Sequence, residues 1–573
     1  MKINADMRFK NISSSEKDFL FDAKLNDVTS NYNQLKKLLP NILGNALPIE
    51  METLGDFSIE GNTQIKSSKI SADIDLFSKI GNVTTNLELT NISEIEKSNY
   101  KGEVKLIDFN LGKFFNDAAL GKVTADASVN GVGFKIENIN TGAIGSVKSI
   151  EFNDYVYQDI YVNGLFQNKL FNGNVKVNDA FLKMRFSGLA DFSSKVNKFD
   201  FTASIEEANL LETNLFTRDS ISTLKGIVEI DVVGNTLDDM IGKATFRNVV
   251  YTNQKQPYNF RKFTVTSGFK NEIKNITIAS ENIVQGYFKG NFNFNEIQPM
   301  AQNALGSMFS NFSPYEVAPN KFIEFDLNVY NQIVDVFFPD IFIGSNTKVR
   351  GRIDSKTNGI RLNFDSPKVI AFNNEIEKIA VRLNNKNPLF TSHLTAKEVD
   401  TEFYNASELN LINRIKNDTL FFKSEFKSAT SVDKTFNMDF YYTFNEDEKF
   451  VLGIEKSSFD FKENVWKINP NQNKENKVVL DFKKEEFIFS PFELVSENQE
   501  IVFKGTVRDS TYKDLKINFK EVNLSSFLPP IDSLAIHGIL SGEIDCLQNE
   551  GSYAPKGDLS IACLRINSFE QGD

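Results

Sequence analysis

The sequence predicts an all-β protein built on a long, twisted, mostly antiparallel sheet. Apolar and polar residues alternate with a period of two through much of the 573 residues, which is typical of strands that are apolar on one side. Turns rich in Asn, Gly, Asp and Lys separate these runs at short spacing. Short turns favour antiparallel meanders over βαβ crossovers.

A short phrase of an aromatic residue, a spacer and a glycine recurs along the chain. It occurs as Tyr100-Lys101-Gly102, Phe171-Asn172-Gly173, Phe186-Ser187-Gly188, Phe288-Lys289-Gly290 and Phe503-Lys504-Gly505. Recurrence over hundreds of residues predicts a repetitive architecture. We interpret the phrase as a strand marker, in which the aromatic ring packs on one face and the glycine leaves that face open or lets the sheet bend.

Composition favours one continuous body over several domains. The chain has 53 Phe, 1 Trp and 14 Pro, and it contains no Pro-, Gly- or Ser-rich linker. We therefore expect a single elongated unit over residues 1–573. Because the sequence starts and stops in strand-like segments, we also expect a fragment of a longer protein.

Charge and hydropathy exclude several classes. The net charge is -12 without a basic stripe, which argues against nucleic-acid binding and against a polybasic membrane-surface patch. The first residues lack the apolar core of a signal peptide, and no apolar stretch approaches the roughly 20 residues of a transmembrane helix.

Helical segments are few. Residues Tyr32–Leu39, ended by Pro40, and Ile297–Phe312 have helical spacing of apolar residues, and we expect short helical plugs or caps within 30–47 and 297–312. Such helices would cover an open end or seam of a sheet that otherwise exposes an unpaired edge.

A longer phrase predicts where the chain leaves the sheet. Strand-like segments end in Asn110-Leu111, Asn209-Leu210 and Asn523-Leu524, and a Gly-containing strand follows each after a short segment. We expect a strand to end at each Asn, followed by a compact excursion and the next strand.

The two cysteines are candidates for a disulfide. If the polar stretch 548–557 contains a hairpin turn centred midway between Cys546 and Cys563, the two cysteines would face each other. The alternative is two small apolar side chains in a core. Two cysteines are too few for a disulfide scaffold and wrongly spaced for zinc.

Parts of the chain resemble a known family. The segments Tyr100–Phe134, Asn178–Gly188 and Phe201–Leu215 are similar to the central region of TamB-like translocation and assembly module proteins, within the AsmA-like group. The resemblance is strongest over Tyr100–Tyr251 and Ile501–Phe569. It implies a sheet folded along its length into an open groove (a β-taco), reaching through the periplasm from an inner-membrane anchor to the outer membrane. The family has no catalytic motif to transfer.

The resemblance implies a role in outer-membrane biogenesis through phospholipid transport, or alternatively in the translocation and assembly of outer-membrane or secreted proteins. The implied partners are phospholipid or acyl chains and an outer-membrane barrel assembly partner, engaged through regions missing here. We expect the groove to be lined by Val123, Ala125, Ala127, Val129, Leu182, Met184, Phe186, Phe199, Phe201, Ile205, Val228, Ile230, Ile323, Phe325 and Leu327.

The alternation alone leaves other architectures open. A closed β-sandwich or solenoid core has the same pattern, and a channel differs from it by leaving a large apolar strip exposed. An outer-membrane barrel would need more regular strands, and a filament or adhesin would seal its apolar residues inside.

Catalysis has little support in the sequence. His393 and His537 are far apart, no phosphate-loop occurs, and Gly131-Val132-Gly133 is not followed by a helix-opening glycine, so we expect no enzyme, cofactor or metal. The carboxylate pairs Asp238-Asp239 and Glu485-Glu486 lie in charged, turn-like segments. A β-helical carbohydrate-active enzyme is the remaining enzymatic alternative.

Overall fold

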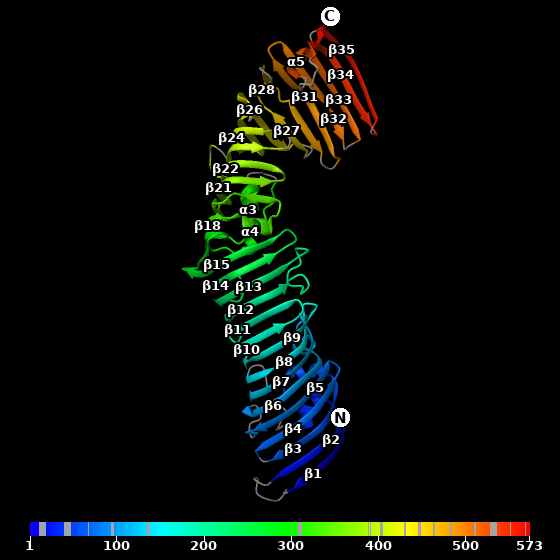
Figure 1. Ribbon diagram of the computed structural model, residues 1–573, viewed down its shortest axis with the longest axis vertical. Coiled ribbons are helices and arrows are strands. Elements are labelled where there is room, and N and C mark those ends of the chain that lie inside the picture. Colours follow the sequence, from blue (N-terminus) through cyan, green and yellow to red (C-terminus); the bar gives the residue numbers. More distant parts are fainter. Residues whose placement is uncertain are drawn as a thin grey trace. The chain divides into compact units, whose positions relative to one another are not determined.

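The computed structural model confirms the all-β class, with 70% of residues in strands, 8% in helices and antiparallel pairing (Figure 1). It describes residues 1–573 except 11–18, 39–46, 67, 93–96, 135–137, 308–311, 388, 390, 402–404, 429–430, 445–448, 462–463, 482–483, 509–510, 528–535, 551, 568 and 573, and the side chains of 431–434 and 569–572. The chain forms two compact units. Unit 1 is Met1–Lys270 with Ile276–Glu281, and unit 2 is Asn271–Asn275 with Asn282–Asp573.

Unit 1 is an uninterrupted antiparallel meander, in which each strand from β1 to β15 pairs with the next. Each strand, which we also call a rung of the sheet, is therefore connected to the previous one by a turn or by a short segment outside the sheet. The strands are β1 (Lys2–Lys10), β2 (Leu20–Asn31), β3 (Asp56–Lys66), β4 (Lys69–Ser78), β5 (Gly81–Thr90), β6 (Asn99–Asn110), β7 (Leu120–Val132), β8 (Asn140–Phe152), β9 (Tyr155–Gln167), β10 (Leu170–Asn178), β11 (Leu182–Asp191), β12 (Lys198–Asn209), β13 (Thr223–Val233), β14 (Ile241–Thr252) and β15 (Pro257–Lys270).

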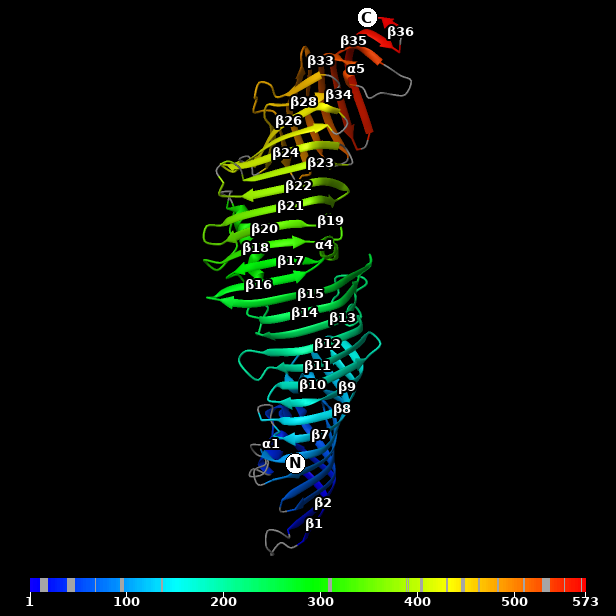
Figure 2. The ribbon, with the colours of Figure 1, turned by 60° about the vertical axis from the view of Figure 1, so that its left-hand side comes forward.

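Unit 2 follows the same plan with two irregularities (Figure 2). β18 pairs with β20 while the short β19 pairs with β21, and the meander also changes between β26 and β31. The strands are β17 (Val284–Gly290), β18 (Phe322–Val329), β19 (Ile341–Ile343), β20 (Thr347–Asp354), β21 (Gly359–Ala371), β22 (Asn374–Asn384), β23 (Ser392–Asp400), β24 (Asn405–Lys416), β25 (Thr419–Ser428), β26 (Ser431–Phe444), β27 (Phe450–Ile454), β28 (Ser457–Phe461), β29 (Asn464–Ile468), β30 (Lys477–Asp481), β31 (Glu486–Ser496), β32 (Gln499–Arg508), β33 (Tyr512–Asn523), β34 (Ile536–Asn549), β35 (Ser552–Ile566) and β36 (Phe569–Gly572); β16 (Ile273–Ser280) contributes to both units.

Between β26 and β31, two rungs are each broken into two short strands. β27 and β28 pair with different parts of β26, and they pair in turn with β30 and β29, which both contact β31. Asn469 lies at the break, where its Nδ2 donates to the Ile454 carbonyl at 2.8 Å and its Oδ1 accepts from Asn473 N at 2.6 Å. Trp466 beside it has no exposed surface. The amide thus replaces ladder hydrogen bonds that a continuous strand would make.

The helices are short and lie in the connections between strands. They are α1 (Tyr32–Leu38), η2 (Ile49–Leu54) and α2 (Leu111–Phe115) in unit 1, and η4 (Phe294–Glu296), α3 (Ile297–Gly306), α4 (Asn331–Phe337) and α5 (Leu524–Phe527) in unit 2. The predicted helix at 297–312 begins where expected and ends at Gly306, with 308–311 outside the described residues. The predicted cap at 30–47 corresponds to α1, and its residues 39–46 also lie outside the described set.

The Asn-Leu prediction is confirmed, because β6, β12 and β33 end at Asn110, Asn209 and Asn523. The side chain of each accepts a backbone hydrogen bond from the following segment. The Asn110 Oδ1 accepts from Lys113 N at 2.8 Å, and the Asn209 Oδ1 accepts from Glu212 N at 3.2 Å. Asparagine is favoured here because its short side chain caps amides that leave the ladder.

Bulges near these strand ends interrupt the alternation. The ladder shifts between Leu106 and Phe109 in β6, where Asp108 has φ 48°, and between Phe519 and Val522 in β33, where Glu521 has φ 51°. Each extra residue twists the strand locally. Because of it, the apolar side chain after the bulge points to the same face of the sheet as the apolar side chain before the bulge.

The cysteine pairing predicted from the sequence is wrong. The β34–β35 turn lies between Asn549 and Ser552, earlier than the centre of the polar stretch, so Cys546 faces Pro555. The two cysteines are not bonded to each other. The error arose because polarity extends past the turn into β35, whose residues 552–560 are exposed.

Candidate functional site: the apolar face of the sheet

One face of unit 1 carries an apolar row that crosses every strand of the meander. We call this side of the sheet the apolar face. Directly paired residues, one from each strand, form the row, and all but Thr85 are apolar or glycine. They are Ala5, Leu25, Gly61, Ile74, Thr85, Val104, Ala127, Gly145, Val162, Val175, Phe186, Ala203, Val228, Phe246 and Phe263.

The residues predicted to line a groove in unit 1 all lie on the apolar face. Cross-strand pairing joins Ala127 to the row, and Met184 pairs with Ile205 on the same face. Val123 is buried at 3% exposure, whereas the other predicted lining residues of β7, β11, β12 and β13 are half-buried. A sealed core would bury them as fully as Val123.

Phenylalanine rings follow one another across β9 to β12 on the apolar face. Phe166 and Phe171 have ring centroids 4.9 Å apart, Phe171 and Phe186 6.1 Å, and Phe186 and Phe201 5.0 Å. Phe166 remains 38% exposed. These rings provide a continuous, partly wet apolar surface over four strands.

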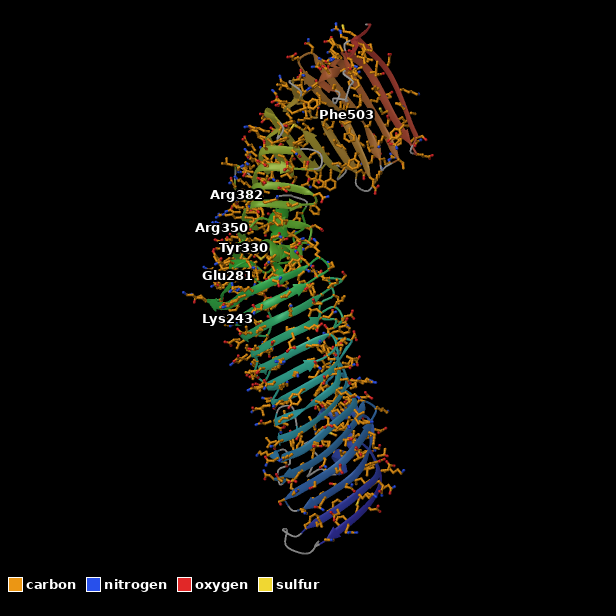
Figure 3. All side chains as sticks on the ribbon, in the orientation of Figure 1. Lys243, Glu281, Tyr330, Arg350, Arg382 and Phe503 are labelled. Atoms are coloured by element: carbon orange, nitrogen blue, oxygen red, sulfur yellow. The ribbon has the colours of Figure 1, made fainter. Side chains whose placement is uncertain are left out.

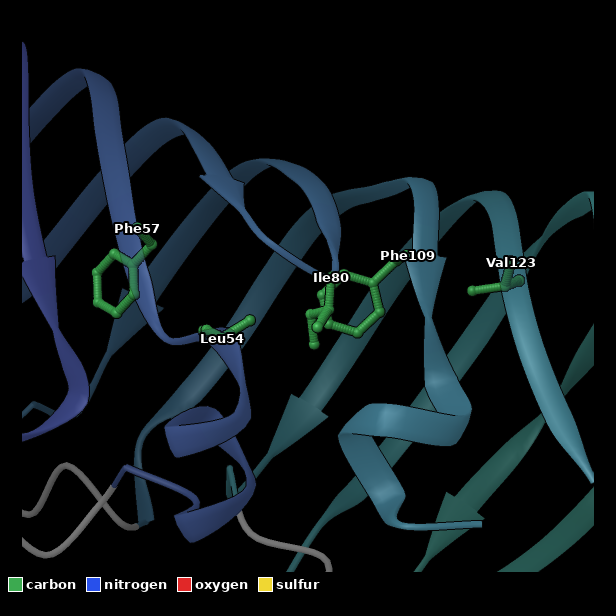
Figure 4. Packing of buried hydrophobic residues seen from close by; sticks show 5 residues of the cluster. All are labelled: Leu54, Phe57, Ile80, Phe109 and Val123. Carbon is green, nitrogen blue, oxygen red and sulfur yellow. The ribbon is translucent and has the colours of Figure 1, made fainter. Parts of the chain in front are cut away.

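Helices cover the apolar face along one margin of unit 1. Leu54, Phe57, Ile80, Phe109 and Val123 form a buried cluster there (Figure 4). Partly buried side chains from α1, η2 and α2 pack against it, among them Leu35, Met51 and Phe114. Exposure on β7 rises from Val123 to Ala125, Ala127 and Val129. The margin is thus sealed, and the surface opens away from it.

Farther along unit 1, residues 210–222 take the place of a helix at this margin. The Tyr157 hydroxyl donates to the Thr213 carbonyl at 3.3 Å, and the Tyr251 hydroxyl donates to the Asp219 carboxylate. Arg218 binds that carboxylate through two hydrogen bonds of 2.9 and 2.7 Å. The hydrogen bond from Arg218 holds the pKa of Asp219 below its usual range, so the carboxylate stays ionised although it is 6% exposed.

In unit 2 the predicted lining residues lie on one face but are covered differently. Ile323 pairs with Ile353, and Phe325 with Gly351. Ile323 is 1% exposed, and Met300 and Ala304 of the neighbouring α3 are 1% and 0% exposed. α3 packs against β20 and β21, so the apolar face carries a protein layer at these rungs. Phe325 and Leu327 are half-buried.

The opposite side of the sheet, which we call the charged face, carries cross-strand ion pairs. In unit 1, Lys183 pairs with Glu207 at 2.9 Å and Arg185 with Glu206 at 2.9 Å. In unit 2, Arg350 and Arg382, labelled in Figure 3, pair with Asp326 and Asp365. Exposed pairs of this kind add little stability, about 0–1 kcal/mol each, but they keep this side hydrated.

The described residues offer little for catalysis. His393 lies on β23 with Nε2 2.7 Å from Asn410 Oδ1, and His537 lies on β34 opposite Arg565. Asp239 accepts backbone hydrogen bonds in a turn, and Glu486 pairs with Arg508. Within the described part of the chain, no group of three or more His, Cys, Asp or Glu could hold a metal ion. The described helices include none long and apolar enough to cross a membrane.

Several residues of the apolar face escaped sequence prediction. In β9, Tyr157 and Ile160 share this face although they are three residues apart, because Asp159 between them has φ 50° and is left out of the β8–β9 pairing together with Lys148. This irregularity breaks the period of two. A signal was present in Asp159 itself, since Asp and Asn are enriched where φ is positive.

Comparisons with protein-family models, curated proteins and solved structures find no match to this chain.

Proposed function

We propose that the protein holds phospholipid acyl chains on its apolar face and passes them along the sheet of unit 1, as part of a periplasmic bridge between inner and outer membranes. The row of paired apolar residues through β1–β15, largely half-buried, carries this proposal. The resemblance of residues 100–251 to TamB-like proteins gives the cargo class and the location.

Continuity of the row matters more than the affinity at any one rung. Each buried methylene contributes about 0.8 kcal/mol. An acyl chain that moves from one apolar strand to the next therefore loses and regains the same burial free energy. Neighbouring strands lie about 4.8 Å apart, which makes each step small. A single charged rung would interrupt this exchange through its desolvation cost.

The strands are also wide enough for a lipid tail. β7 has 13 residues, which corresponds to about 43 Å at 3.3 Å per residue. Strands of this length form because the alternation continues through bulges. An acyl chain can therefore lie along or across the strands.

A second candidate is a scaffold for the assembly of outer-membrane or secreted proteins. Exposed apolar side chains on β1 favour it: Ile3 is 46%, Met7 49% and Phe9 52% exposed. They would suit an amphipathic strand of a client protein. Client crosslinks to β1 without bound lipid would favour this candidate.

Lipid occupancy tests the proposal directly. The full chain is purified without detergent, and co-purifying phospholipid is identified by mass spectrometry. Photoreactive residues at Phe186 should crosslink to lipid, and Phe186→Asp should abolish transfer between vesicles. Ser187→Asp, the matched control on the charged face of the same strand, should leave transfer unchanged. Lipid-free protein, or equal transfer by both variants, contradicts the proposal.

A further inference from the structure

α3 divides the apolar face of unit 2. The helix is anchored at its C-terminal half, where Asn303 Nδ2 donates to the Tyr315 carbonyl at 2.9 Å and Asn303 Oδ1 accepts from Tyr315 N at 2.8 Å. From the sheet, Asn385 Nδ2 donates to the Ala304 carbonyl at 2.7 Å. These bonds hold α3 and the 312–315 segment together against the strands.

A cavity of about 420 Å³ lies immediately beyond the end of this helix. Leu305, Phe312 and Tyr315 form one wall. Leu383, Ile415 and Leu420 form the other wall. Leu383 belongs to the apolar face because it pairs with Leu362, and Leu362 pairs with Gly351, the partner of Phe325. Pairing continues from Leu383 through Ser392 to Asn413, and Ile415, two residues farther along the same strand, pairs with Leu420. The volume falls within the range of about 300–1,000 Å³ typical of small-molecule sites.

The cavity is apolar and reachable from solvent. Leu305 is 41% and Tyr315 is 52% exposed. Two of the polar side chains at its rim bond within the fold: Thr391 Oγ1 accepts from Ile415 N at 3.2 Å, and Asn413 Oδ1 accepts from Ser392 N at 3.0 Å. Gln302 is the other polar residue of the lining with an amide side chain. The lining therefore suits a hydrocarbon chain better than a polar ligand.

From the cavity, the apolar face continues toward β31. Leu420 pairs with Tyr442, Tyr442 with Leu452, and Leu452 with Val478. On its other side α3 blocks the face at β20 and β21. A chain lying on β25–β30 would therefore meet α3 end-on.

We propose that this cavity binds the methyl-terminal part of an acyl chain and that α3 is the stop against which the chain ends. The inference rests on the proposed function, since it assigns a fixed binding site within the same apolar face. It names the ligand as the hydrocarbon end of a fatty acid or phospholipid, and it requires no contact with a headgroup.

Photolabelling with two fatty acids tests the site. The full chain is incubated with palmitate carrying a diazirine at its methyl end, and separately with palmitate carrying the diazirine near the carboxylate. Labelled peptides are then identified by mass spectrometry. The methyl-end probe should label 302–315 and 415–420 at least tenfold more strongly than the carboxyl-end probe.

Two matched pairs of variants sharpen the test. Leu420→Trp fills the cavity and should reduce methyl-end labelling of 302–315 at least tenfold, while Arg414→Trp, on the exposed face of the neighbouring β24, should not. Leu305→Asp places a charge at the exposed wall and should have the same effect, whereas Gln298→Asp at the start of α3 should have none. Leu305 is exposed, so this variant remains informative if Leu420→Trp does not fold.

The labelling of unit 1 separates this inference from the proposed function. Label on peptides containing Phe186 and Phe201, without label at the cavity, overturns the chain stop and leaves the lipid groove. No label in either place overturns both. Equal labelling of the cavity by both probes, or labelling unchanged in Leu420→Trp and Leu305→Asp, overturns the chain stop.

Discussion

Unit 1 and the α3 region of unit 2 use the same strand chemistry with different outcomes. In unit 1 the phrase Phe186-Ser187-Gly188 lies on a half-buried surface, and in unit 2 the phrase Phe288-Lys289-Gly290 pairs with β18, whose Ile323 is 1% exposed. The strands do not cause this difference. It arises because the chain leaves the sheet after β17 and places α3 on the apolar face before β18 begins.

The comparison shows that alternation specifies which face is apolar, and excursions specify whether that face is covered. In unit 1 the excursions remain at the margin, where they bury Val123 and leave Ala125, Ala127 and Val129 half-exposed. In unit 2 one such segment, which contains α3, packs directly on the strands β20 and β21. An open surface and a closed core can therefore alternate along one kind of sheet.

The largest difference is expected between two methionines. Met300→Asp should destabilise the α3 region by more than about 3 kcal/mol, because Met300 is 1% exposed and the new carboxylate has no partner. Met184→Asp, on the half-buried surface of unit 1, should cost only about 1 kcal/mol. Hydrogen exchange of β18–β21 and β10–β12 peptides measures both. Similar costs would show that the two surfaces are equally covered.

Two glycines test what the units share. A Cβ on Gly188 would lie 2.3 Å from the Asp200 carbonyl oxygen, one on Gly290 would lie 2.0 Å from the Phe322 carbonyl oxygen, and both residues have positive φ. Alanine at either position should cost about 2 kcal/mol or more. Gly142→Ala is the control, since its nearest atom is 3.7 Å away. Urea unfolding measures each cost, and a neutral Gly188→Ala would contradict the shared geometry.

Acid should destabilise the segment 210–222, which covers the margin of unit 1, before it destabilises α3, which covers the apolar face of unit 2. The folded-state pKa of Asp219 is lowered, so its contribution is present above the unfolded pKa of about 3.9 and is lost as pH falls through the folded pKa. The amides of Asn303 and Asn385 that hold the C-terminal half of α3 do not titrate. Hydrogen exchange of 210–222 should therefore accelerate at low pH ahead of exchange of 303–306. Asp219→Asn should lower the free energy of local opening of 210–222 by about 1–3 kcal/mol at neutral pH. Loosening of both segments together would contradict this assignment.

The smallest effects are expected on the charged face of both units. Arg185→Gln in unit 1 and Arg350→Gln in unit 2 each remove one exposed ion pair. Each should change stability by about 0–1 kcal/mol, less at high salt. Thermal unfolding at low and high salt measures this, and a loss above 2 kcal/mol would show that these pairs have a structural role.

Local chemistry made much of the fold predictable. Asn110, Asn209 and Asn523 predicted three strand ends because a capping side chain acts within a few residues. The alternation placed Val123, Met184 and Ile230 on one face for the same reason. These features depend only on residues that are close together in the sequence, so they can be predicted from one sequence.

The rest depended on contacts distant in sequence. The burial of Ile323, on the strand next to the rungs that α3 covers, and of Trp466, beside the broken rungs, depends on contacts between distant segments, and no periodicity encodes these. The β34–β35 register failed because polar residues continue beyond the turn at 549–552. The apolar face of β9 could not be read from the alternation alone, because Asp159, with its positive φ, changes which residues after it point to that face.

The consecutive pairing of β1–β15 also determines how such a sheet can change length. In a hairpin of two adjacent strands, the chain begins and ends at the same margin of the sheet. A hairpin can therefore be gained or lost without altering which face is apolar. Each such event changes the row by about 10 Å. Gain or loss of a single strand would make the next strand end at the opposite margin of the sheet. The Asn-capped segment that follows such a strand would then lie at the wrong margin. Length should therefore vary among related chains in steps of two strands.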